Sequence, residues 1–332
     1  MSPKIIKVIL QELAIFTTVI VILSILTASA EVSCGNASVS NEMNLLKFPE
    51  LLKSQLKYSL DIFKNEGNRV ITIQHGNTTS TIIIPSPHET FVSVVGTTPG
   101  RAILLTLTIL SISLLLIFII GVVWGLRAGY RGGRSDRILQ FLGPAFSAIP
   151  GWFWAVALLW VFWWKLSVFP LSYIDYIHRA SVEGNVTVLT HLKGLALPII
   201  TLTLVNVPVY AMNVRNLVVR AKNEDYILTD VLKGLPDDRI ERKLLRVVLP
   251  SFLTFTSYSF LNLLMNDMAV EVLFNVPGIG MTFLIGVGML IHSGFGDMFF
   301  FASLVMSAMY FMNASIFESL YLKLDPRVRR DA

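Results

Sequence analysis

Charged residues are scarce in this chain. Asp, Glu, Lys and Arg make up 15% of its 332 residues, whereas an ordinary soluble domain carries about 25%. Hydrophobic residues make up 54%, the mean hydropathy is +0.65, and the apolar residues gather into blocks such as 102–120, 153–164 and 299–311. A soluble enzyme, a disordered chain and a fibrous protein are therefore excluded, and the pattern indicates a polytopic membrane protein.

Cysteine is also scarce, and the motifs of common catalytic sites are missing. The single cysteine, Cys34, excludes an internal disulfide framework and a cysteine-rich metal site. The five histidines have no metal-ligand spacing, and the sequence contains no H-E-x-x-H, G-x-S-x-G or G-x-x-x-x-G-K-S/T motif. We therefore expect no metal site, no catalytic residue and no nucleotide bound by this chain through a phosphate loop.

Six segments are long enough to cross a bilayer, which takes roughly 20 apolar residues for a core of about 30 Å. The third contains Pro144 and Pro150, so we expect it to be broken, with its first part near the membrane interface. A seventh apolar stretch, 273–291, contains Asn275, Pro277 and several glycines, which favours a broken or re-entrant outer segment. The six predicted spans are 8–28, 102–126, 138–164, 194–214, 247–270 and 298–322.

Basic residues set the orientation of these spans. The N-terminus, segments 127–137 and 215–246 and the tail together hold 18 of the 27 Lys and Arg residues, and all four lie on one side of the predicted spans. This distribution predicts a multi-pass protein of the cell (inner) membrane with both termini in the cytoplasm. It also accounts for the net charge of +5, so we expect contact with the lipid bilayer and no nucleic-acid partner.

The N-terminal segment 1–30 has two interpretations. Lys4 and Lys7, an apolar stretch and Ala28-Ser29-Ala30 resemble a cleavable signal peptide. The apolar stretch is longer than a usual signal-peptide core, which favours a retained transmembrane helix.

The domain organisation follows from the spans. We expect an all-α polytopic membrane protein with six transmembrane helices, plus a small mixed extracytoplasmic domain at 31–100. This domain contains β-like runs at 69–73 and 81–84. A core of five transmembrane helices is expected at 101–322, with a cytoplasmic loop at 220–246, an outer broken segment at 272–297 and a cytoplasmic tail at 323–332.

The cytoplasmic loop contains start and stop signals of a short helix. Asn223 suits the N-cap, with acidic residues in the first turn, including Asp225. Gly234 fits the left-handed position after the helix, and Pro236 prevents its continuation. We predict a helix over 224–233 that lies outside the membrane.

One face of this predicted helix carries side chains of mixed polarity. Tyr226, Thr229, Asp230 and Lys233 share it by three- and four-residue spacing. Such a rigid surface suits docking into a partner protein. A solvated connecting helix is the alternative.

Polar residues also occur at membrane depth in the fifth span. Asn262, Asn266 and Asp267 are candidates for a translocation path, because polar groups inside a membrane often mark one. Glu271 has a second interpretation, in which it pins the following outer turn, or gate, by hydrogen bonds. The candidate residues of that turn are Pro277, Gly278 and Gly280.

Four motifs occur in one order along residues 101–329. Together they resemble the inner-membrane permeases of ABC importers, and most of all the first permease type of the dipeptide/oligopeptide class. Asp230 and Leu232 depart from the small residues usual in that family. The motifs are Arg131-Gly-Gly-Arg-Ser-Asp-Arg137, the stretch from Leu197-Pro198 to Leu249-Pro250, Glu271-Val-Leu-Phe-Asn-Val-Pro-Gly-Ile-Gly280 and Leu324-Asp-Pro-Arg-Val-Arg329.

The resemblance implies a transport subunit that is not itself an enzyme. Its partners would be a second homologous permease, two ABC ATPase subunits that bind ATP and Mg, and an extracytoplasmic solute-binding protein, with no cofactor on this chain. The helix at 224–233 would be the coupling helix to the ATPase. Peptides or oligosaccharides would be the cargo. The implied coupling residues are Asp225, Tyr226, Thr229, Lys233, Gly234 and Leu235.

Two other classes of function stay open. A channel or an ion-gradient-driven transporter would need charged residues near the midplane of several spans, and these are largely absent. A membrane sensor would use the loop at 223–236 to recruit a signalling protein, but the sequence shows no cytoplasmic output domain.

Overall fold

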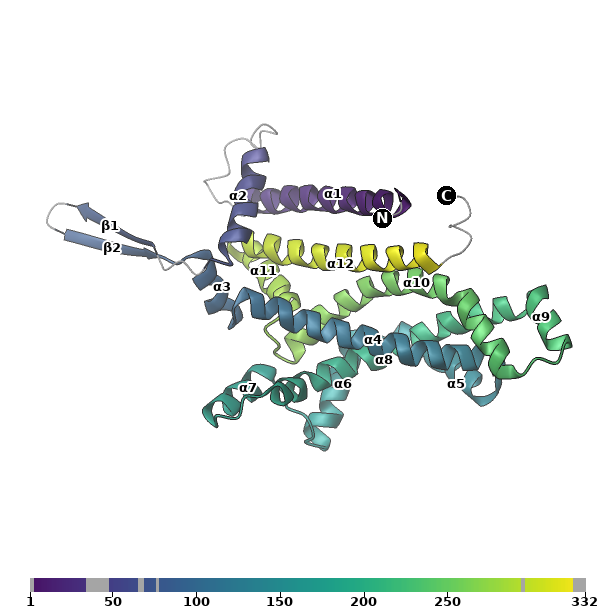
Figure 1. Cartoon of the computed structure of the whole chain (residues 1–332). Coiled ribbons are helices and arrows are strands. Elements are labelled where there is room, and N and C mark those ends of the chain that lie inside the picture. Colours follow the sequence, from purple (N-terminus) through teal and green to yellow (C-terminus); the bar gives the residue numbers. More distant parts are fainter. Residues whose placement is uncertain (1–2, 34–47, 65–68, 76–77, 294–295, 325–332) are drawn as a thin grey trace. The chain divides into compact units, whose positions relative to one another are not determined.

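The computed structural model describes residues 3–33, 48–64, 69–75, 78–293 and 296–324 (Figure 1). Cys34 and residues 325–332 of the predicted tail lie outside the described residues. The elements are α1 (Pro3–Ser33), α2 (Phe48–Asp61), β1 (Arg69–His75), β2 (Thr78–Ile84), α3 (Pro87–Val95), α4 (Pro99–Arg131), α5 (Gly133–Ala148), α6 (Gly151–Leu159), the π-helical η2 (Trp160–Lys165), α7 (Tyr173–Val182), α8 (Val188–Lys222), α9 (Asp225–Leu232), α10 (Asp237–Leu273), α11 (Ile279–Ser293) and α12 (Asp297–Leu324).

Five of the described helices are long and apolar enough to cross a membrane. They are α4, α8, α10, α12 and the part of α1 from Ile6 to Ser29. The segments Gly133–Ala148 and Gly151–Lys165 form a sixth apolar stretch, bent by 101°. This arrangement agrees with a polytopic, mainly helical membrane protein, while the count of six spans stays a prediction.

The bend in the predicted third span lies at Pro150. Pro144 is accommodated inside α5, whereas Ile149 is extended and Pro150 precedes the first turn of α6. The α5 helix packs along α8, because a Cβ atom on Gly143 would lie 3.1 Å from the Cβ of Met212. The predicted third span is therefore broken, with α5 and α6 at 101° to one another (Figure 1), and the position of its first part near the membrane interface stays a prediction.

Small residues bring α4 and α8 together. Gly121, Gly125 and Gly129 recur every four residues on α4, so they lie on one face. A Cβ atom on Gly125 would lie 2.5 Å from the carbonyl oxygen of Ala211 on α8. Close backbone approach through small residues is a common way for membrane helices to associate. The glycine spacing therefore fixes the distance between these two helices.

The described chain divides into two compact units. The first comprises residues 1–13, 108–274 and 310–332, and the second comprises residues 14–107 and 275–309. The first unit contains α5 to α10, and with them the loop that is predicted to be cytoplasmic.

In the second unit, α2 packs on α1 through a buried polar contact. The Ser24 hydroxyl donates to Oε1 of Gln55 at 2.6 Å, and Nε2 of Gln55 donates to the Thr27 hydroxyl at 2.6 Å. On α3, the ring of Phe91 packs edge-on against Phe301 of α12, with ring centroids 5.7 Å apart. The segment between the first two long helices is thus attached to neighbouring helices of its own unit.

The predicted β-like runs form one antiparallel hairpin. Strand β1 pairs with β2 from Arg69 opposite Ile84 to His75 opposite Thr78. The seventh apolar stretch contains a single 15-residue helix, α11. The backbone N–H of Ile279 at its start donates to the Thr106 hydroxyl on α4 at 2.8 Å. The placement of 31–100 outside the membrane stays a prediction.

Candidate functional site: the loop helix and an adjoining groove

The loop helix α9 lies between α8 and α10 and covers Asp225–Leu232, one residue shorter at each end than predicted. The prediction of Asn223 as its N-cap is wrong. Asn223 instead ends α8, where its N–H bonds to the carbonyls of Arg220 and Ala221, and Glu224 precedes α9 without a side-chain cap. The long α8 continues to Lys222 and so takes Asn223 into its own last turn.

The C-terminal end of α9 has the predicted left-handed glycine. Gly234 has φ of +72°, and the N–H of Leu235 bonds back to the carbonyl of Asp230 at 3.2 Å. A Cβ atom at Gly234 would meet no other atom within 4 Å. A side chain at this position would therefore strain the backbone without clashing with a neighbour.

One side of α9 is attached to the rest of its unit. Ile227 is fully buried, and the Asp230 carboxylate forms an ion pair with Lys243 of α10. The Lys243 ammonium also lies 5.5 Å from the ring centroid of Tyr226. Tyr226 and Asp230, predicted to share the docking face, thus contact Lys243 of α10, while Tyr226 stays 37% exposed. The Thr229 hydroxyl donates back to the carbonyl of Asp225 at 2.7 Å.

The other side of α9 exposes an apolar tip, which consists of Leu228, Val231 and Leu232. Their exposed fractions are 47%, 50% and 87%. The sequence prediction missed Leu228 and Val231, although spacings of three and four residues placed all three near one another on a helix. Lys233 is exposed beside this tip, and Leu235 is half-buried.

Polar contacts join the ends of the helices around α9. The Tyr130 hydroxyl at the end of α4 donates to Oδ1 of Asp237 on α10 at 2.7 Å. The Lys222 ammonium at the end of α8 donates to the backbone carbonyl of Tyr130 at 2.7 Å. On α8, the Arg215 guanidinium forms two hydrogen bonds with the Asp136 carboxylate of α5, at 2.8 and 3.1 Å. The loop helix therefore lies on a connected base of four helices.

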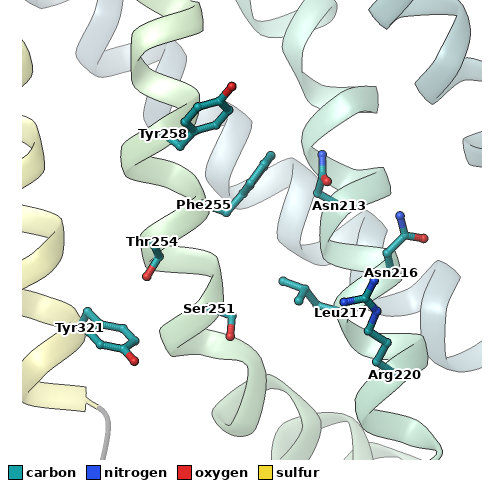
Figure 2. A pocket seen from close by; sticks show the side chains of 9 residues that line it. All are labelled: Asn213, Asn216, Leu217, Arg220, Ser251, Thr254, Phe255, Tyr258 and Tyr321. Carbon is teal, nitrogen blue, oxygen red and sulfur yellow. The ribbon is translucent and has the colours of Figure 1, made fainter. Parts of the chain in front are cut away.

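A groove lies between α8 and α10 in the same unit. Its larger part is a cavity of about 530 Å³, and Figure 2 shows Arg220, Asn213 and Asn216 from α8 facing residues of α10. Tyr321 of α12 lines one side. The smaller part, about 260 Å³, adjoins it through shared lining residues and extends to Asn206 and Asn262.

The structure separates the three path candidates of the fifth span. Asn262 lines the smaller cavity. Asn266 lies against α6, because a Cβ atom on Gly151 would come within 2.2 Å of its Oδ1 atom. Asp267 is fully buried, as is Glu271 one turn later. Only Asn262 of the three therefore lies on the groove.

The predicted outer turn is buried and internally bonded. Pro277, Gly278 and Gly280 are all buried, and the N–H of Gly278 bonds to the carbonyl of Val276 at 2.8 Å. A pinning role for Glu271 stays a prediction.

Most of the groove was not predicted from the sequence, although a signal was present. Ser251, Thr254, Tyr258 and Asn262 recur every three or four residues within an otherwise apolar span. Such spacing places polar groups on one face of a helix. Across the described ranges, no three His, Cys, Asp or Glu side chains lie together in a way that would hold a metal ion.

Comparison with known proteins places these features in a family. Residues 121–330 match the family described as the binding-protein-dependent transport system inner membrane component. The chain is 27% identical over 235 residues to the probable D,D-dipeptide transport system permease protein DdpB of Escherichia coli, which covers 66% of this chain and 68% of that protein.

Two further relatives are similar over shorter segments. Identity is 25% over 218 residues with the oligopeptide transport system permease protein OppB of Haemophilus influenzae, covering 64% of this chain and 66% of that protein. It is 25% over 182 residues with the metal-staphylopine import system permease protein CntB of Staphylococcus aureus, covering 54% of each. The resemblance to dipeptide/oligopeptide permeases is confirmed, and the chain belongs to the family of inner-membrane components of binding-protein-dependent transport systems.

Proposed function

We propose that this chain is a permease subunit of an ATP-driven ABC importer, and that α9 couples it to a separate ATPase subunit. The observation that carries the proposal is the two-sided character of α9. One side is attached through Ile227 and the Asp230–Lys243 ion pair, while the other exposes the apolar tip. An attached helix that exposes leucine side chains outside the membrane has the character of a protein interaction site.

The contact surface on α9 is centred on the apolar tip. Lys233 and Leu235 adjoin it, and Gly234 fixes the direction in which the chain leaves the helix. Asp225 and Thr229 lie on the exposed surface of the same helix. Tyr226 contributes by contact with Lys243, which orients the helix. Closure of the ATPase subunits would push α9 as a rigid body, and α8 and α10 would move with it.

The complete transporter would contain a second homologous permease, two ABC ATPase subunits with ATP and Mg, and an extracytoplasmic solute-binding protein. The chain would form half of the translocation pathway, and it would bind neither a cofactor nor nucleic acid. Both termini would be cytoplasmic, on the same side as α9, because the basic segments lie there. Residues 31–100 would then be extracytoplasmic.

The cargo is proposed to be a peptide or an oligosaccharide. Two relatives are named for D,D-dipeptide and oligopeptide transport and a third for metal-staphylopine import, which favours a peptide-like organic solute. The competing hypothesis is a gradient-driven transporter, a channel or a membrane sensor without ATPase coupling. Under that hypothesis, α9 would have no ATPase to bind.

The first test is a pull-down of the tagged chain in mild detergent, followed by mass spectrometry. We expect a P-loop ATPase and a second permease in the eluate. Leu232→Asp should remove the ATPase, because it places a charge on the apolar tip. Val182→Asp is the matched control, since Val182 at the end of α7 is 77% exposed and lies outside the loop. Recovery of the chain without an ATPase would contradict the proposal.

A second test separates coupling from assembly. Gly234→Val should lower solute-stimulated ATP hydrolysis in the reconstituted importer, because a left-handed conformation costs a non-glycine residue about 1–2 kcal/mol. Gly184→Val is a close control, since Gly184 has φ of +71° and its Cβ would also meet nothing within 4 Å. Equal hydrolysis in the two variants would show that α9 does not transmit the signal.

A further inference from the structure

One side of α5 is exposed and changes from basic to apolar along the helix. Arg134, Arg137, Ile138 and Phe141 share this side, because the last three follow the first by three, four and seven residues. Both arginines are exposed, and the exposed fractions of Ile138 and Phe141 are 52% and 74%. We call these four residues the basic–apolar face.

The opposite side of α5 is packed against α4 and α8, which fixes the direction of the basic–apolar face. Leu139 is fully buried and belongs to a cluster with Ala128 of α4 and Ala211 of α8. Nε1 of Trp124 on α4 donates to the Ser135 hydroxyl at 3.0 Å. Rotation of α5 to bury its exposed apolar side chains would break these contacts.

The two arginines of this face have no acidic partner in the part of the chain that the structure describes. Asp136 lies between them in the sequence, but its carboxylate accepts from Arg215 of α8 at 2.8 and 3.1 Å and from Nε2 of Gln140 at 2.8 Å. The Asp136 charge is thus already paired within the protein. Exposed guanidinium groups without a carboxylate favour an oxyanion, above all a phosphate, which they bind in a bidentate manner.

The apolar part of the face favours a lipid over other sources of a phosphate. At 1.5 Å per residue, Phe141 lies about 6 Å beyond Arg137 along the helix and about 10 Å beyond Arg134. Apolar residues of interfacial helices are buried by about 5–10 Å into the boundary between headgroups and acyl chains. A phospholipid therefore matches both ends of the face, whereas a soluble phosphate would leave the Phe141 ring in water.

The place of α5 along the chain agrees with such a ligand. The basic segment 127–137 is predicted to be cytoplasmic, and the face continues from it into the predicted third span, 138–164. The cytoplasmic leaflet contains anionic lipids, which attract arginine and lysine residues next to a membrane segment. The arginines would thus lie at the level of the headgroups, with the apolar residues deeper.

We propose that the basic–apolar face of α5 binds an anionic phospholipid, with the headgroup phosphate at Arg134 and Arg137 and an acyl chain on Ile138 and Phe141. The site does not depend on the proposed transport function. It also differs from a general attraction of basic loops to the membrane, because it requires charge and apolar side chains together on one fixed face.

The first experiment identifies the retained lipid by native mass spectrometry. The full chain in mild detergent is mixed with equal amounts of dioleoyl phosphatidylglycerol and dioleoyl phosphatidylcholine. We expect the anionic lipid to be retained in preference. Arg134→Gln with Arg137→Gln should lower the ratio of anionic to zwitterionic lipid by about fivefold for each arginine removed.

The matched control is Arg239→Gln with Arg242→Gln. These two arginines of α10 are exposed and have the same spacing, but Lys243 and Arg246 follow them at the positions where α5 has its apolar residues. The lipid ratio should stay at its native value in this variant. An equal loss in the two double variants would show that retention follows net charge alone and would overturn the proposal.

The second experiment distinguishes a lipid from other ligands. Phe141→Ser should lower the retention of phosphatidylglycerol, and an excess of inorganic phosphate should not displace it. Displacement by phosphate, or unchanged retention in Phe141→Ser, would identify a free-anion site and overturn the proposal. So would an α5 double variant that loses the ATPase in the pull-down while its lipid ratio is unchanged, because the face would then contact a protein. Lipid retention is measured without the ATPase, so its failure would leave the proposed function untouched.

Discussion

The ion pair between Asp230 and Lys243 is the sharpest place to perturb the loop helix. It joins α9 to α10, and Lys243 also lies over the Tyr226 ring at 5.5 Å. The Asp230 side chain is 13% exposed and that of Lys243 is 44% exposed. A partly exposed ion pair contributes about 0.2–1 kcal/mol, and a cation–π contact of this kind contributes about 0.5–1 kcal/mol.

Lys243→Met should remove both contacts while it retains the length of the aliphatic chain. A loss of about 1–2 kcal/mol corresponds to a roughly 5- to 30-fold larger population in which α9 is detached. Hydrogen exchange of the backbone amides in Asp225–Leu232 measures that population directly. We expect exchange in α9 to accelerate by this factor, while exchange in Tyr173–Val182 of α7, which serves as the internal reference, stays unchanged.

The charge-exchanged double variant Asp230→Lys with Lys243→Asp tests the cause. It restores an ion pair with reversed polarity, and the cation now at position 230 lies four residues from Tyr226 on the same helix face. We therefore expect exchange in α9 to return most of the way to the native rate. If the double variant exchanges as fast as the single variants, or if Lys243→Met leaves α9 protected, the ion pair does not hold the helix and the reasoning is refuted.

Two further predictions concern helix packing elsewhere in the chain. Gly125→Val should destabilise the first unit by about 1–3 kcal/mol, because a Cβ atom would lie 2.5 Å from the Ala211 carbonyl oxygen. The measurement is the thermal unfolding temperature, which should fall. Gly288→Val is the control, since a Cβ atom there meets nothing within 4 Å. Gln55→Leu should weaken the attachment of α2 to α1, because it leaves the buried Thr27 hydroxyl without its donor from Gln55. The cost is about 1–3 kcal/mol, and backbone amide exchange in α2 should accelerate. Unchanged exchange in α2 would contradict this.

Features with a local cause were predictable from the sequence. Gly234 lies directly after an amphipathic turn and two residues before Pro236, and its left-handed conformation follows from those neighbours alone. The break at Pro150 is local in the same way, because proline disfavours helix in the preceding residue. The two predicted β-like runs are likewise covered by β1 and β2.

Features that depend on distant residues were not predictable. The prediction of Asn223 as an N-cap was wrong because α8, a mostly buried helix, continues to Lys222. A local signal had suggested that the loop helix begins there. Tyr226 and Asp230 turn toward α10 because Lys243, 13 residues beyond Asp230, lies there. Prediction of the groove would have required the pairing of α8 with α10, since the row of polar residues on either helix forms no cavity alone. A periodicity search on polar residues would have marked each row without showing that they face one another.

The proposed coupling involves the same two helices that line the groove. A buried hydrogen bond of 2.6 Å joins the Tyr210 hydroxyl on α8 to the Thr256 hydroxyl on α10. Thr256 already donates to the Phe252 carbonyl at 2.7 Å, so Tyr210 is the donor in this contact. From here to Lys222, next to α9, α8 extends by 12 residues, or about 18 Å.

The larger cavity lies on the α9 side of this contact, between Asn213 and Arg220 of α8 and the facing part of α10. The contact at Tyr210 holds one end of this part of α8, and α9 adjoins its other end. A movement of α9 would therefore displace α8 more near Lys222 than near Tyr210. On the proposed function, a push on α9 would therefore change the separation of the cavity walls more at Arg220 than at Asn213.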